Sequence, residues 1–463
     1  MTLLVKLLRL AGVDRAVGYG VLARLWQVVA GPVSMIVIAT NLSREQQGFY
    51  FTFNSIVALQ LFFELGLTGV ISTFVSHEFV DLAWENRGRI SGDSRSLQRL
   101  EDILAKATLW FFVASILLFV VLVPTGLLFF GQAKHTGVDF SWRLPWILVV
   151  AGTSCNLMVT PFFSVLMGSG DVANVNKREM LGAIVGPILS WTVLLLHGGL
   201  FAAPAVAFGN MLVSWLYLAR QKPELLKKAW DCVKNIRREK HQEARVSWRG
   251  EIWPLQWKIA LSWMSGYFLF QLFNPILFHY HGPVVAGQMG MTLSATNALI
   301  GVCITWISAK GPEFGKLIAQ REWRRLDELF NRVLLQTSVI SVIGALGGWS
   351  IIWFLQGHYK IGARFIPASD AAFLLAAVCI VVIVFGLATY LRAHKQEPFM
   401  VLSISSALIQ GSAIWVTGKY FSSRGVSMAY FAVSLFFVLP YAVIVWRRCR
   451  RMWHSEGTGV LTK

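Results

Sequence analysis

Apolar stretches of about 20 residues recur along the whole chain, and no other feature constrains its fold as strongly. A helix of that length crosses the ~30 Å hydrocarbon core of a bilayer. The 463 residues are 55% hydrophobic and only 14% charged, and the mean hydropathy is +0.57. A soluble domain has about a quarter of its residues charged, and the strands of a membrane barrel alternate polar and apolar residues over ~10 positions. The sequence therefore predicts an all-α integral membrane protein.

Twelve such stretches can be placed, in two sets of six. The longest polar stretch, "QKPELLKKAWDCVKNIRREKHQEARVSWRGE", separates the sixth from the seventh. Six plus six spans is the organisation expected of two structural repeats, which many transporters have. The predicted spans cover 18–41, 49–76, 107–130, 144–168, 179–197, 200–220, 257–281, 287–310, 332–356, 370–392, 398–418 and 425–446.

These spans divide the chain into five parts. The starts of the second helices of the two sets, "GFYFTFNSIVAL" (48–59) and "GQMGMTLSATNAL" (287–299), resemble each other only weakly. The first 17 residues fit either a short amphipathic helix on the inner leaflet or a frayed basic start. The predicted parts are a cytoplasmic amphipathic segment (1–17), an N-terminal six-helix lobe (18–220), a basic cytoplasmic connecting loop (221–256), a C-terminal six-helix lobe (257–446) and a cytoplasmic tail (447–463).

The charge of the chain predicts its orientation. Lys and Arg number 42 against 24 Asp and Glu, for a formal net charge of +18. In a soluble protein this excess would suggest nucleic acid as a partner. Here most of the basic residues lie before the first span, in alternate loops and in the C-terminal tail, so the positive-inside rule accounts for them. We expect both termini in the cytoplasm and no nucleic-acid partner.

The sequence lacks the patterns that carry enzymatic or metal chemistry. The five cysteines are scattered, without a CxxC or other ligand spacing, so neither a disulfide nor a metal site is expected. No hydrolase elbow, phosphate loop or dinucleotide fingerprint is present. We therefore expect no catalytic residues and no cofactor, and the cytosolic loops are too short to hold an ATPase domain.

Arg24 and Gln27 are polar residues inside the first span. Arg24 lies about six residues, or ~9 Å, into the helix. At that depth its long side chain can snorkel back to the cytosolic headgroups. Alternatively, it faces a cavity and binds an anionic group through two parallel hydrogen bonds. Both interpretations stay open, and Arg24 and Gln27 are candidate substrate-binding residues.

Glu64 lies near the middle of the second span, in "LFFELGLTGV". It is about twelve residues, or ~18 Å, from the cytosolic end, which is too deep for a glutamate to snorkel. A carboxyl group at that depth is a candidate proton carrier or the counter-ion of a cation. The alternative is a neutral glutamic acid that is hydrogen-bonded to a neighbouring helix.

Four amides and a lysine complete the candidate substrate-binding residues. Gln271 and Asn274 are three residues apart, so they share one helix face. Asn54 and Asn297 lie in the second spans of the two sets. Such amides serve as hydrogen-bonding glue between helices more often than as ligand-binding groups. Lys310 ends the eighth span, as an inside anchor or as a contact to phosphate.

Two stretches resemble a known family. The first is "RLWQVVAGPVSMIVIATNLSREQQGFYFTFNSIVALQLFFELGLTGVISTFVSHEF", and the second is "GQMGMTLSATNALIGVCITWISAKGPEFGKLIAQREWRRLDELF". They look like the openings of the two halves of the bacterial polysaccharide-exporting flippases of the multidrug/oligosaccharidyl-lipid/polysaccharide (MOP) superfamily. The resemblance implies two six-helix lobes around a central cavity that opens alternately to each side, the MATE/MOP-like architecture.

The resemblance also implies a function. Such proteins move a polyprenyl-pyrophosphate-linked oligosaccharide across the bacterial inner membrane, for O-antigen or exopolysaccharide synthesis. It implies a lipid-linked substrate, membrane lipids and a polysaccharide polymerase complex as partners. Family members place cavity arginines at the depth of Arg24, and Glu64 falls on an acidic-x-Gly motif of the family.

Two other functions compete with this one. A multidrug or cation antiporter of the same superfamily would favour an acidic and aromatic lining, which one intramembrane carboxylate and one intramembrane arginine do not supply. A membrane enzyme, such as a glycan polymerase, would need a large extracytoplasmic loop or a His/Asp pair at a membrane face. The predicted outer loops are short, which argues against the enzyme.

Overall fold

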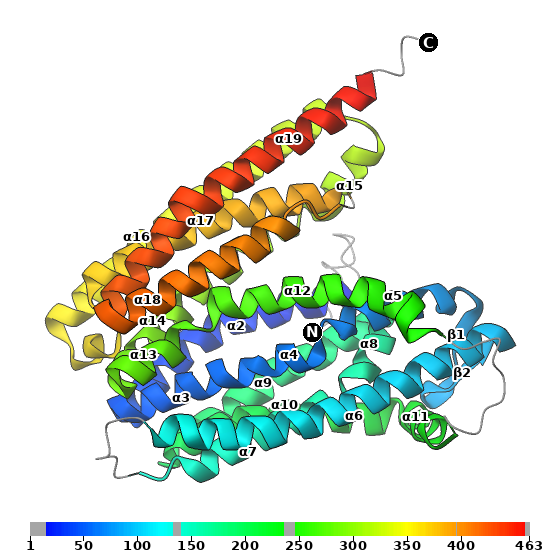
Figure 1. Cartoon of the computed structure of the whole chain (residues 1–463), viewed down its shortest axis with the longest axis horizontal. Coiled ribbons are helices and arrows are strands. Elements are labelled where there is room, and N and C mark those ends of the chain that lie inside the picture. Colours follow the sequence, from blue (N-terminus) through cyan, green and yellow to red (C-terminus); the bar gives the residue numbers. More distant parts are fainter. Residues whose placement is uncertain (1–14, 133–139, 236–245, 395, 459–463) are drawn as a thin grey trace, which may run out of the picture. The chain divides into compact units, whose positions relative to one another are not determined.

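A computed structural model describes residues 15–132, 140–235, 246–394 and 396–458 (Figure 1). Nearly all of these residues are helical, which confirms the predicted all-α class. Within the described ranges, the one sheet is an antiparallel hairpin of β1 (Leu82–Trp84) and β2 (Ile90–Gly92). Residues 1–14 of the predicted amphipathic segment lie outside the described residues.

Most helices of the first half of the chain overlap the predicted spans; η marks short 3-10 or π-helices. In order they are α2 (Arg15–Asn41), α3 (Arg44–Val57), η1 (Ala58–Gln60), α4 (Leu61–Glu64), α5 (Leu67–Glu78), η2 (Phe79–Asp81), η3 (Asn86–Gly88), α6 (Ser94–Gly131), α7 (Arg143–Leu157), α8 (Thr160–Gly168), α9 (Val172–Leu195), η4 (Gly199–Phe201), α10 (Ala202–Gln221), α11 (Pro223–Asn235) and η5 (Trp248–Ile252).

The second half continues with helices throughout. They are α12 (Trp253–Phe270), α13 (Phe273–His281), α14 (Pro283–Ser308), α15 (Gly311–Ala319), α16 (Trp323–His358), η6 (Lys360–Arg364), α17 (Ala368–Ala393), α18 (Met400–Val433), η7 (Ser434–Val438) and α19 (Leu439–Thr458).

All twelve predicted spans fall on helices, but some of these helices are broken or merged. Among the described residues, nine helices are long and apolar enough to cross a membrane, or up to ten if one bent pair counts as a span. The last two predicted spans share one stretch, Met400–His454, which is broken at Ser422 (φ 55°, ψ −151°). The seventh is divided between α12 and α13 by a break at Gln271 and Leu272.

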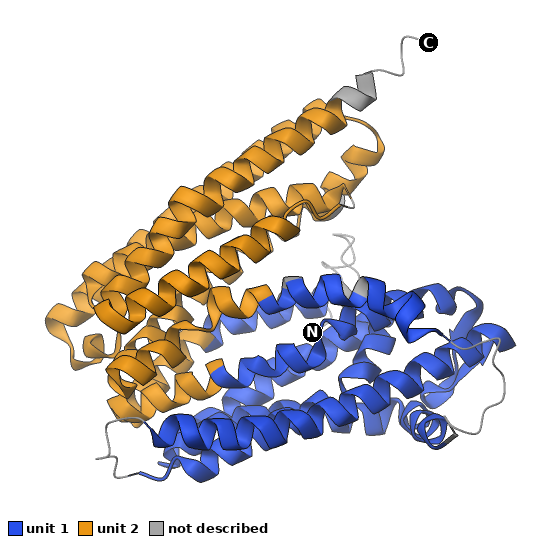
Figure 2. Cartoon of the chain, in the orientation of Figure 1, with its two compact units in different colours: residues 1–30, 56–264 blue, residues 31–55, 265–463 orange. Residues whose placement is uncertain are grey.

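The chain forms two compact units (Figure 2). Unit 1 comprises residues 1–30 and 56–264, and unit 2 comprises residues 31–55 and 265–463. Three helices, α2, α3 and α12, therefore contribute to both units. The predicted lobe boundaries stay a prediction.

Close helix packing shapes the interior of unit 1. Trp146 of α7 is fully buried, and a Cβ atom on Gly126 of α6 would lie 2.1 Å from its ring. The glycine thus leaves the space that the indole fills, as small residues do at membrane helix interfaces. Trp26 donates a hydrogen bond to the carbonyl of Ala183 at 2.8 Å, which joins α2 to α9.

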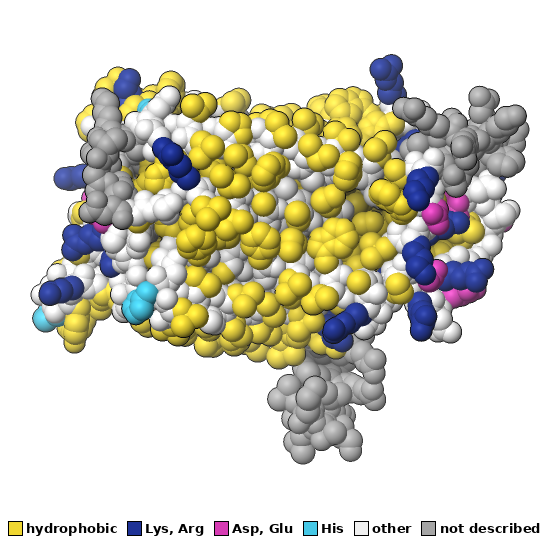
Figure 3. All heavy atoms as spheres, turned by 90° about the horizontal axis from the view of Figure 1, so that it is seen from below, with side chains coloured by type: hydrophobic (Ala, Val, Ile, Leu, Met, Phe, Trp, Pro, Cys, Tyr) yellow, Lys and Arg dark blue, Asp and Glu magenta, His cyan; other side chains and the backbone are white. Residues whose placement is uncertain are grey.

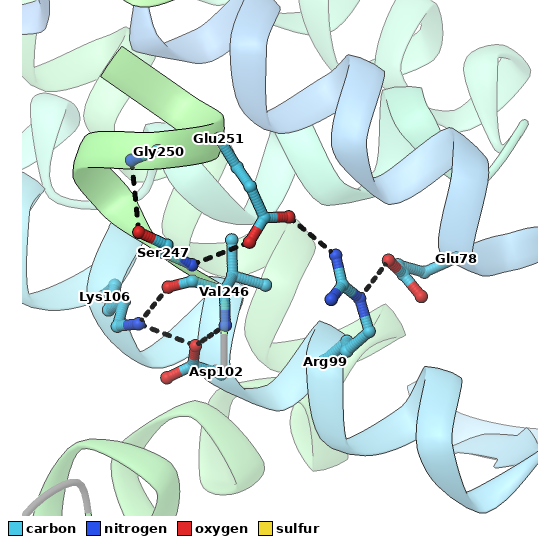
Figure 4. Close-up of polar contacts among 8 residues, drawn as sticks. All are labelled: Glu78, Arg99, Asp102, Lys106, Val246, Ser247, Gly250 and Glu251. Carbon is cyan, nitrogen blue, oxygen red and sulfur yellow. Dashed lines mark hydrogen bonds and ion pairs between the residues drawn. The ribbon is translucent and has the colours of Figure 1, made fainter. Parts of the chain in front are cut away.

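Arg99 forms ion pairs that connect helix ends in unit 1 (Figure 4). The Arg99 guanidinium donates to Glu78 at 2.7 Å and to Glu251 at 2.9 Å. Glu251 also accepts a hydrogen bond from the backbone N–H of Ser247 at 2.9 Å. Arg99 thereby links α5 and α6 to the segment that precedes α12.

Residues 246–252 are also held through the main chain of Val246, which binds side chains of α6. The Asp102 carboxylate accepts from the N–H of Val246 at 2.8 Å, and Lys106 donates to the carbonyl of Val246 at 2.6 Å. Trp248 stacks on Trp110 with ring centroids 5.8 Å apart. Charge, backbone hydrogen bonds and ring stacking therefore fix residues 246–252 on α6.

The surface is consistent with a membrane-spanning protein. The face drawn in Figure 3 is apolar across its middle, and most of its charged side chains gather toward the two ends. Large exposed apolar side chains follow α6 and α16, including Phe112, Val120, Leu346 and Trp353. Apolar surfaces of this kind are typical of contact with a membrane or with another protein.

Candidate functional site

Unit 2 contains a cavity of about 350 Å³ that we call the amide pocket. Four of the predicted site residues line it together: Asn54, Gln271, Asn274 and Asn297. A volume near 350 Å³ lies at the small end of ligand pockets, which run from ~300 to ~1,000 Å³. The full lining is Gly31, Ser34, Met35, Ile38, Tyr50, Phe51, Asn54, Ser55, Phe270, Gln271, Asn274, Gly290, Leu293, Ser294 and Asn297.

The amides of the pocket are available to a ligand. In the part of the chain that the structure describes, the side chains of Asn54, Gln271 and Asn297 have no hydrogen-bond partner. Asn274 donates to Ser55 Oγ at 3.0 Å, while its own Oδ1 is buried and unpartnered. Unpaired amides at the depth of a membrane span are costly unless they face water or a ligand. Because no lining residue is charged, the pocket suits an uncharged polar group.

Local sequence explains the shape of the pocket. The break after Phe270 places Gln271 between two helices. Pro275 follows in the first turn of α13, where its missing N–H costs nothing. Gly290 of α14 lies against Phe51, and a Cβ atom there would come within 2.4 Å of that side chain. The pocket therefore forms where a broken helix meets a close helix crossing.

Arg24 and Gln27 lie on an exposed face of α2 in unit 1. They are three residues apart and so share that face, while Trp26 turns toward α9. No hydrogen bond or ion pair joins either side chain to another described residue. The guanidinium is thus free to bind an anion or to reach the headgroups.

Glu64 lies where the second predicted span breaks. It ends α4, and the next two residues, Leu65 (φ 48°) and Gly66 (φ 64°), are left-handed. The two parts of the span meet at a bend of 43°. A Cβ atom on Gly66 would lie 2.5 Å from the side chain of Ile259, so only glycine fits against α12.

The Glu64 carboxylate is partly exposed and has no hydrogen-bond or ion-pair partner among the described residues. The hydrogen bond to a neighbouring helix that the alternative interpretation requires is not made there. A broken helix also leaves backbone carbonyls without intrahelical partners. Glu64 and this break therefore place a carboxyl group beside a helix end within a span.

Lys310 does not line the amide pocket. It precedes α15 and forms an ion pair with Glu313 at 3.0 Å, with both side chains about half exposed. Such a pair contributes little to stability. The lysine belongs to a helix end rather than to the cavity.

Arg178 is a helix-joining residue that the sequence pattern does not predict. The predicted fifth span began at 179, but α9 begins at Val172, so Arg178 is part of the helix. Its guanidinium donates to Ser214 at 2.9 Å and to Asn156 at 3.2 Å, and it covers the ring of Phe163 at 4.6 Å. The arginine thus joins α7, α9 and α10. The charged run "NKRE" hid the start of the helix, because such a run usually marks a loop.

No group of three or more His, Cys, Asp or Glu within the described ranges could hold a metal ion. All five cysteines, Cys155, Cys232, Cys303, Cys379 and Cys449, are free thiols.

Comparison with known proteins identifies the fold. No protein-family model and no curated protein matches the sequence. The chain is similar in structure to a multidrug resistance MATE family transporter of the MOP superfamily in its inward-facing conformation. The TM-score is 0.65 at 12% identity, over 95% of this chain and 99% of that one.

Two further solved structures agree. One is the MATE multidrug transporter DinF-BH, with a TM-score of 0.60 at 12% identity over 95% of this chain and 96% of that one. The other is the lipid II flippase MurJ in an inward closed conformation, with a TM-score of 0.55 at 11% identity over 96% and 99%. The chain therefore has the two-lobed, multi-pass membrane fold of the MOP superfamily transporters.

Proposed function

We propose that the protein is a flippase for polyprenyl-pyrophosphate-linked oligosaccharide repeat units. It moves them from the inner to the outer leaflet of the bacterial inner membrane by alternating access, for surface polysaccharide synthesis. The observation that carries this proposal is the amide pocket, which is polar, uncharged and lined by three amides without partners. Sugar hydroxyls both donate and accept hydrogen bonds, and amide groups offer both functions.

The substrate explains why such a pocket would lie inside a membrane protein. A glycan and a pyrophosphate are both costly to move through hydrocarbon. A polar cavity lowers this cost, while the polyprenyl tail stays in lipid. Asn54, Gln271, Asn274 and Asn297 then hold the glycan.

Charged residues complete the proposed mechanism. Arg24, with Gln27 on the same exposed face, receives the pyrophosphate, because a guanidinium binds phosphate oxygens through paired hydrogen bonds. Lys310, at a helix end outside the amide pocket, is proposed as a second phosphate contact. Glu64, which has no partner at the break of its span, carries the coupling ion or proton.

The alternative is a multidrug or cation antiporter. Two of the similar structures are multidrug transporters, whereas the third is a flippase for lipid II, a lipid-linked substrate. A site for cationic drugs favours carboxylates, and the amide pocket contains none. This difference favours the flippase. Both termini lie in the cytoplasm in the proposed orientation, and a polysaccharide polymerase complex is the proposed partner.

The deciding experiment uses cells that lack the protein. Their polyprenyl-linked glycans are extracted, and complete repeat units are expected to accumulate while surface polymer disappears. Wild-type protein should reverse this, and the Asn54→Ala/Asn297→Ala double variant should not. Normal surface polymer combined with increased sensitivity to cationic drugs would contradict the flippase and favour the antiporter.

A further inference from the structure

Helix α11 lies at the surface of unit 1, directly after a membrane span. It begins at Pro223, two residues after α10 ends at Gln221. In Figure 1, α11 is seen end-on, whereas α6 and α10 run across the view. Because α6 and α10 cross the membrane, α11 lies roughly in the plane of the membrane surface.

One face of α11 is fixed to unit 1. Leu225 and Ala229 are each 1% exposed and Cys232 is 7% exposed. Lys228 forms an ion pair with Glu101 of α6 at 2.7 Å. α11 is therefore packed firmly against unit 1 through this face, and its opposite face points away from unit 1.

That opposite face combines an aromatic ring with two lysines. Trp230 is 59% exposed, although a tryptophan gains much from burial. Lys227 and Lys234 lie three residues before it and four residues after it, hence on the same face. The Lys234 ammonium is 5.3 Å from the Trp230 ring, and Lys227, although paired with Glu224, has a side chain that is 71% exposed.

The height of α11 matches the headgroup layer. Leu97, Glu101 and Leu104 of α6 face α11 across a shared surface hollow. The apolar part of α6 begins at about residue 107, so Leu104 lies ~4.5 Å and Glu101 ~9 Å from the hydrocarbon. These two residues, which face α11, therefore bracket the headgroup layer. The headgroup layer on each side of a bilayer is roughly 5–8 Å thick. Tryptophan and lysine are the side chains that favour this layer.

We propose that the face formed by Lys227, Trp230 and Lys234 binds the headgroups of anionic phospholipids in the cytosolic leaflet. The two ammonium groups attract lipid phosphates, and the indole ring inserts between headgroups. In the proposed orientation, the cytosolic leaflet is the negative surface next to this helix, and this favours lipid over a protein partner for the two lysines. The site is separate from the amide pocket and does not depend on the transported substrate.

The test uses the full-length chain with its five cysteines replaced by alanine and a nitroxide on Trp230→Cys. The protein is placed in nanodiscs of phosphatidylcholine, with increasing fractions of phosphatidylglycerol. We expect the label to become more accessible to oxygen than to a water-soluble nickel complex as phosphatidylglycerol increases. A label on Arg95→Cys, which is exposed on α6 and ~9 Å further from the hydrocarbon than Glu101, should stay aqueous.

Charge reversal then tests the lysines. Each lysine near an anionic surface contributes about fivefold in affinity. Lys227→Glu/Lys234→Glu should therefore raise the phosphatidylglycerol fraction needed for half of the change several-fold. Lys419→Glu is the matched control, because this exposed lysine of unit 2 also lies beside an aromatic ring, Tyr420, at 5.1 Å.

Three results would overturn the proposal. A label on residue 230 that stays aqueous in both lipids means that the face does not meet the membrane. Immersion without any effect of phosphatidylglycerol means that the lysines do not select anionic lipid. Shielding of the label that is already present in detergent means that a protein, or a second copy of the chain, covers the face.

Discussion

Gly48 and Gly287 pack backbone against backbone in unit 2. A Cβ atom on Gly287 would lie 2.8 Å from the amide nitrogen of Gly48, and one on Gly48 would lie 1.9 Å from the carbonyl oxygen of Pro283. Gln47 donates to the Gly287 carbonyl at 2.8 Å beside this contact. The starts of α3 and α14 therefore cross at a distance that only glycine allows, and both helices continue into the amide pocket.

This crossing predicts that Gly287→Ala destabilises the protein. The added methyl group meets backbone atoms, which cannot rotate away, so the two helices must separate. We expect a loss of about 1–3 kcal/mol, the range for overpacked interiors, measured as a lower Tm in detergent. Gly301→Ala, in the same helix with nothing within 4 Å of its added Cβ, should leave Tm unchanged. Equal Tm values for the two variants would contradict the close crossing.

The amide pocket predicts a loss of transport without a loss of stability. Asn297→Ala removes an exposed amide that has no partner in the described protein. One hydrogen bond to substrate contributes about 1 kcal/mol, so the initial flipping rate in proteoliposomes should fall roughly fivefold at limiting substrate. Asn331→Ala, which removes an exposed amide outside the pocket, is the control. If both variants transport at the wild-type rate, Asn297 does not contact the substrate.

The positions of the membrane-spanning helices could be predicted from the sequence, because hydropathy determines where a helix crosses lipid. The four amides stood out as polar residues inside apolar runs. Their meeting in one pocket could not be predicted, since it depends on the break at Gln271 and on residues 31–55 grouping with unit 2. The start of α9 was missed because Arg178 finds Ser214 and Asn156 as partners. A single sequence does not show such tertiary compensation for a charge.

The lowered pKa of Glu251 predicts how the stability of the protein depends on pH. The hydrogen bond from the Ser247 N–H, followed by the one from Arg99, lowers the pKa of its carboxyl. A lowered folded-state pKa contributes stability above the unfolded value of ~4.3, and this stability is lost as the pH falls through the folded value. Glu251→Gln should therefore lower Tm at pH 7, and its difference from wild type should shrink below about pH 4.

The matched control for Glu251 is a more exposed ion pair. Glu85 and Arg89 lie 3.7 Å apart with side chains 48% and 76% exposed. Glu85→Gln should change Tm little at any pH, because exposed pairs contribute little. A Glu251→Gln difference that is constant from pH 7 to pH 3 would show that the carboxylate charge has no part in the anchoring of residues 246–252.

The proposed role of Arg24 predicts that export requires a guanidinium group at this position. If it receives a pyrophosphate, Arg24→Ala should lower export at least about tenfold, and Arg24→Lys should restore only part of it, because lysine lacks the bidentate fork. Membrane insertion, measured by protein level in the membrane fraction, should be unchanged. Leu25→Ala, on a neighbouring residue that is 58% exposed, should export normally. Normal export by Arg24→Ala would leave the arginine as a snorkelling anchor.

If Glu64 carries the coupling proton, replacing it should abolish the effect of a pH gradient on transport and leave substrate binding intact. The carboxylate lies at the break between α4 and α5 and has no partner among the described residues, so Glu64→Gln should preserve the fold and the Tm. Exchange of substrate without a gradient should continue, because the glycan and phosphate contacts remain. Stimulation by an imposed pH gradient should disappear, since the amide cannot take up a proton.

Glu328→Gln, which changes an exposed carboxylate paired with Arg324 at 3.0 Å, should respond to the gradient like wild type. A Glu64→Gln variant that responds equally would exclude Glu64 as the proton carrier, and transport would then depend on another ion or on removal of the product.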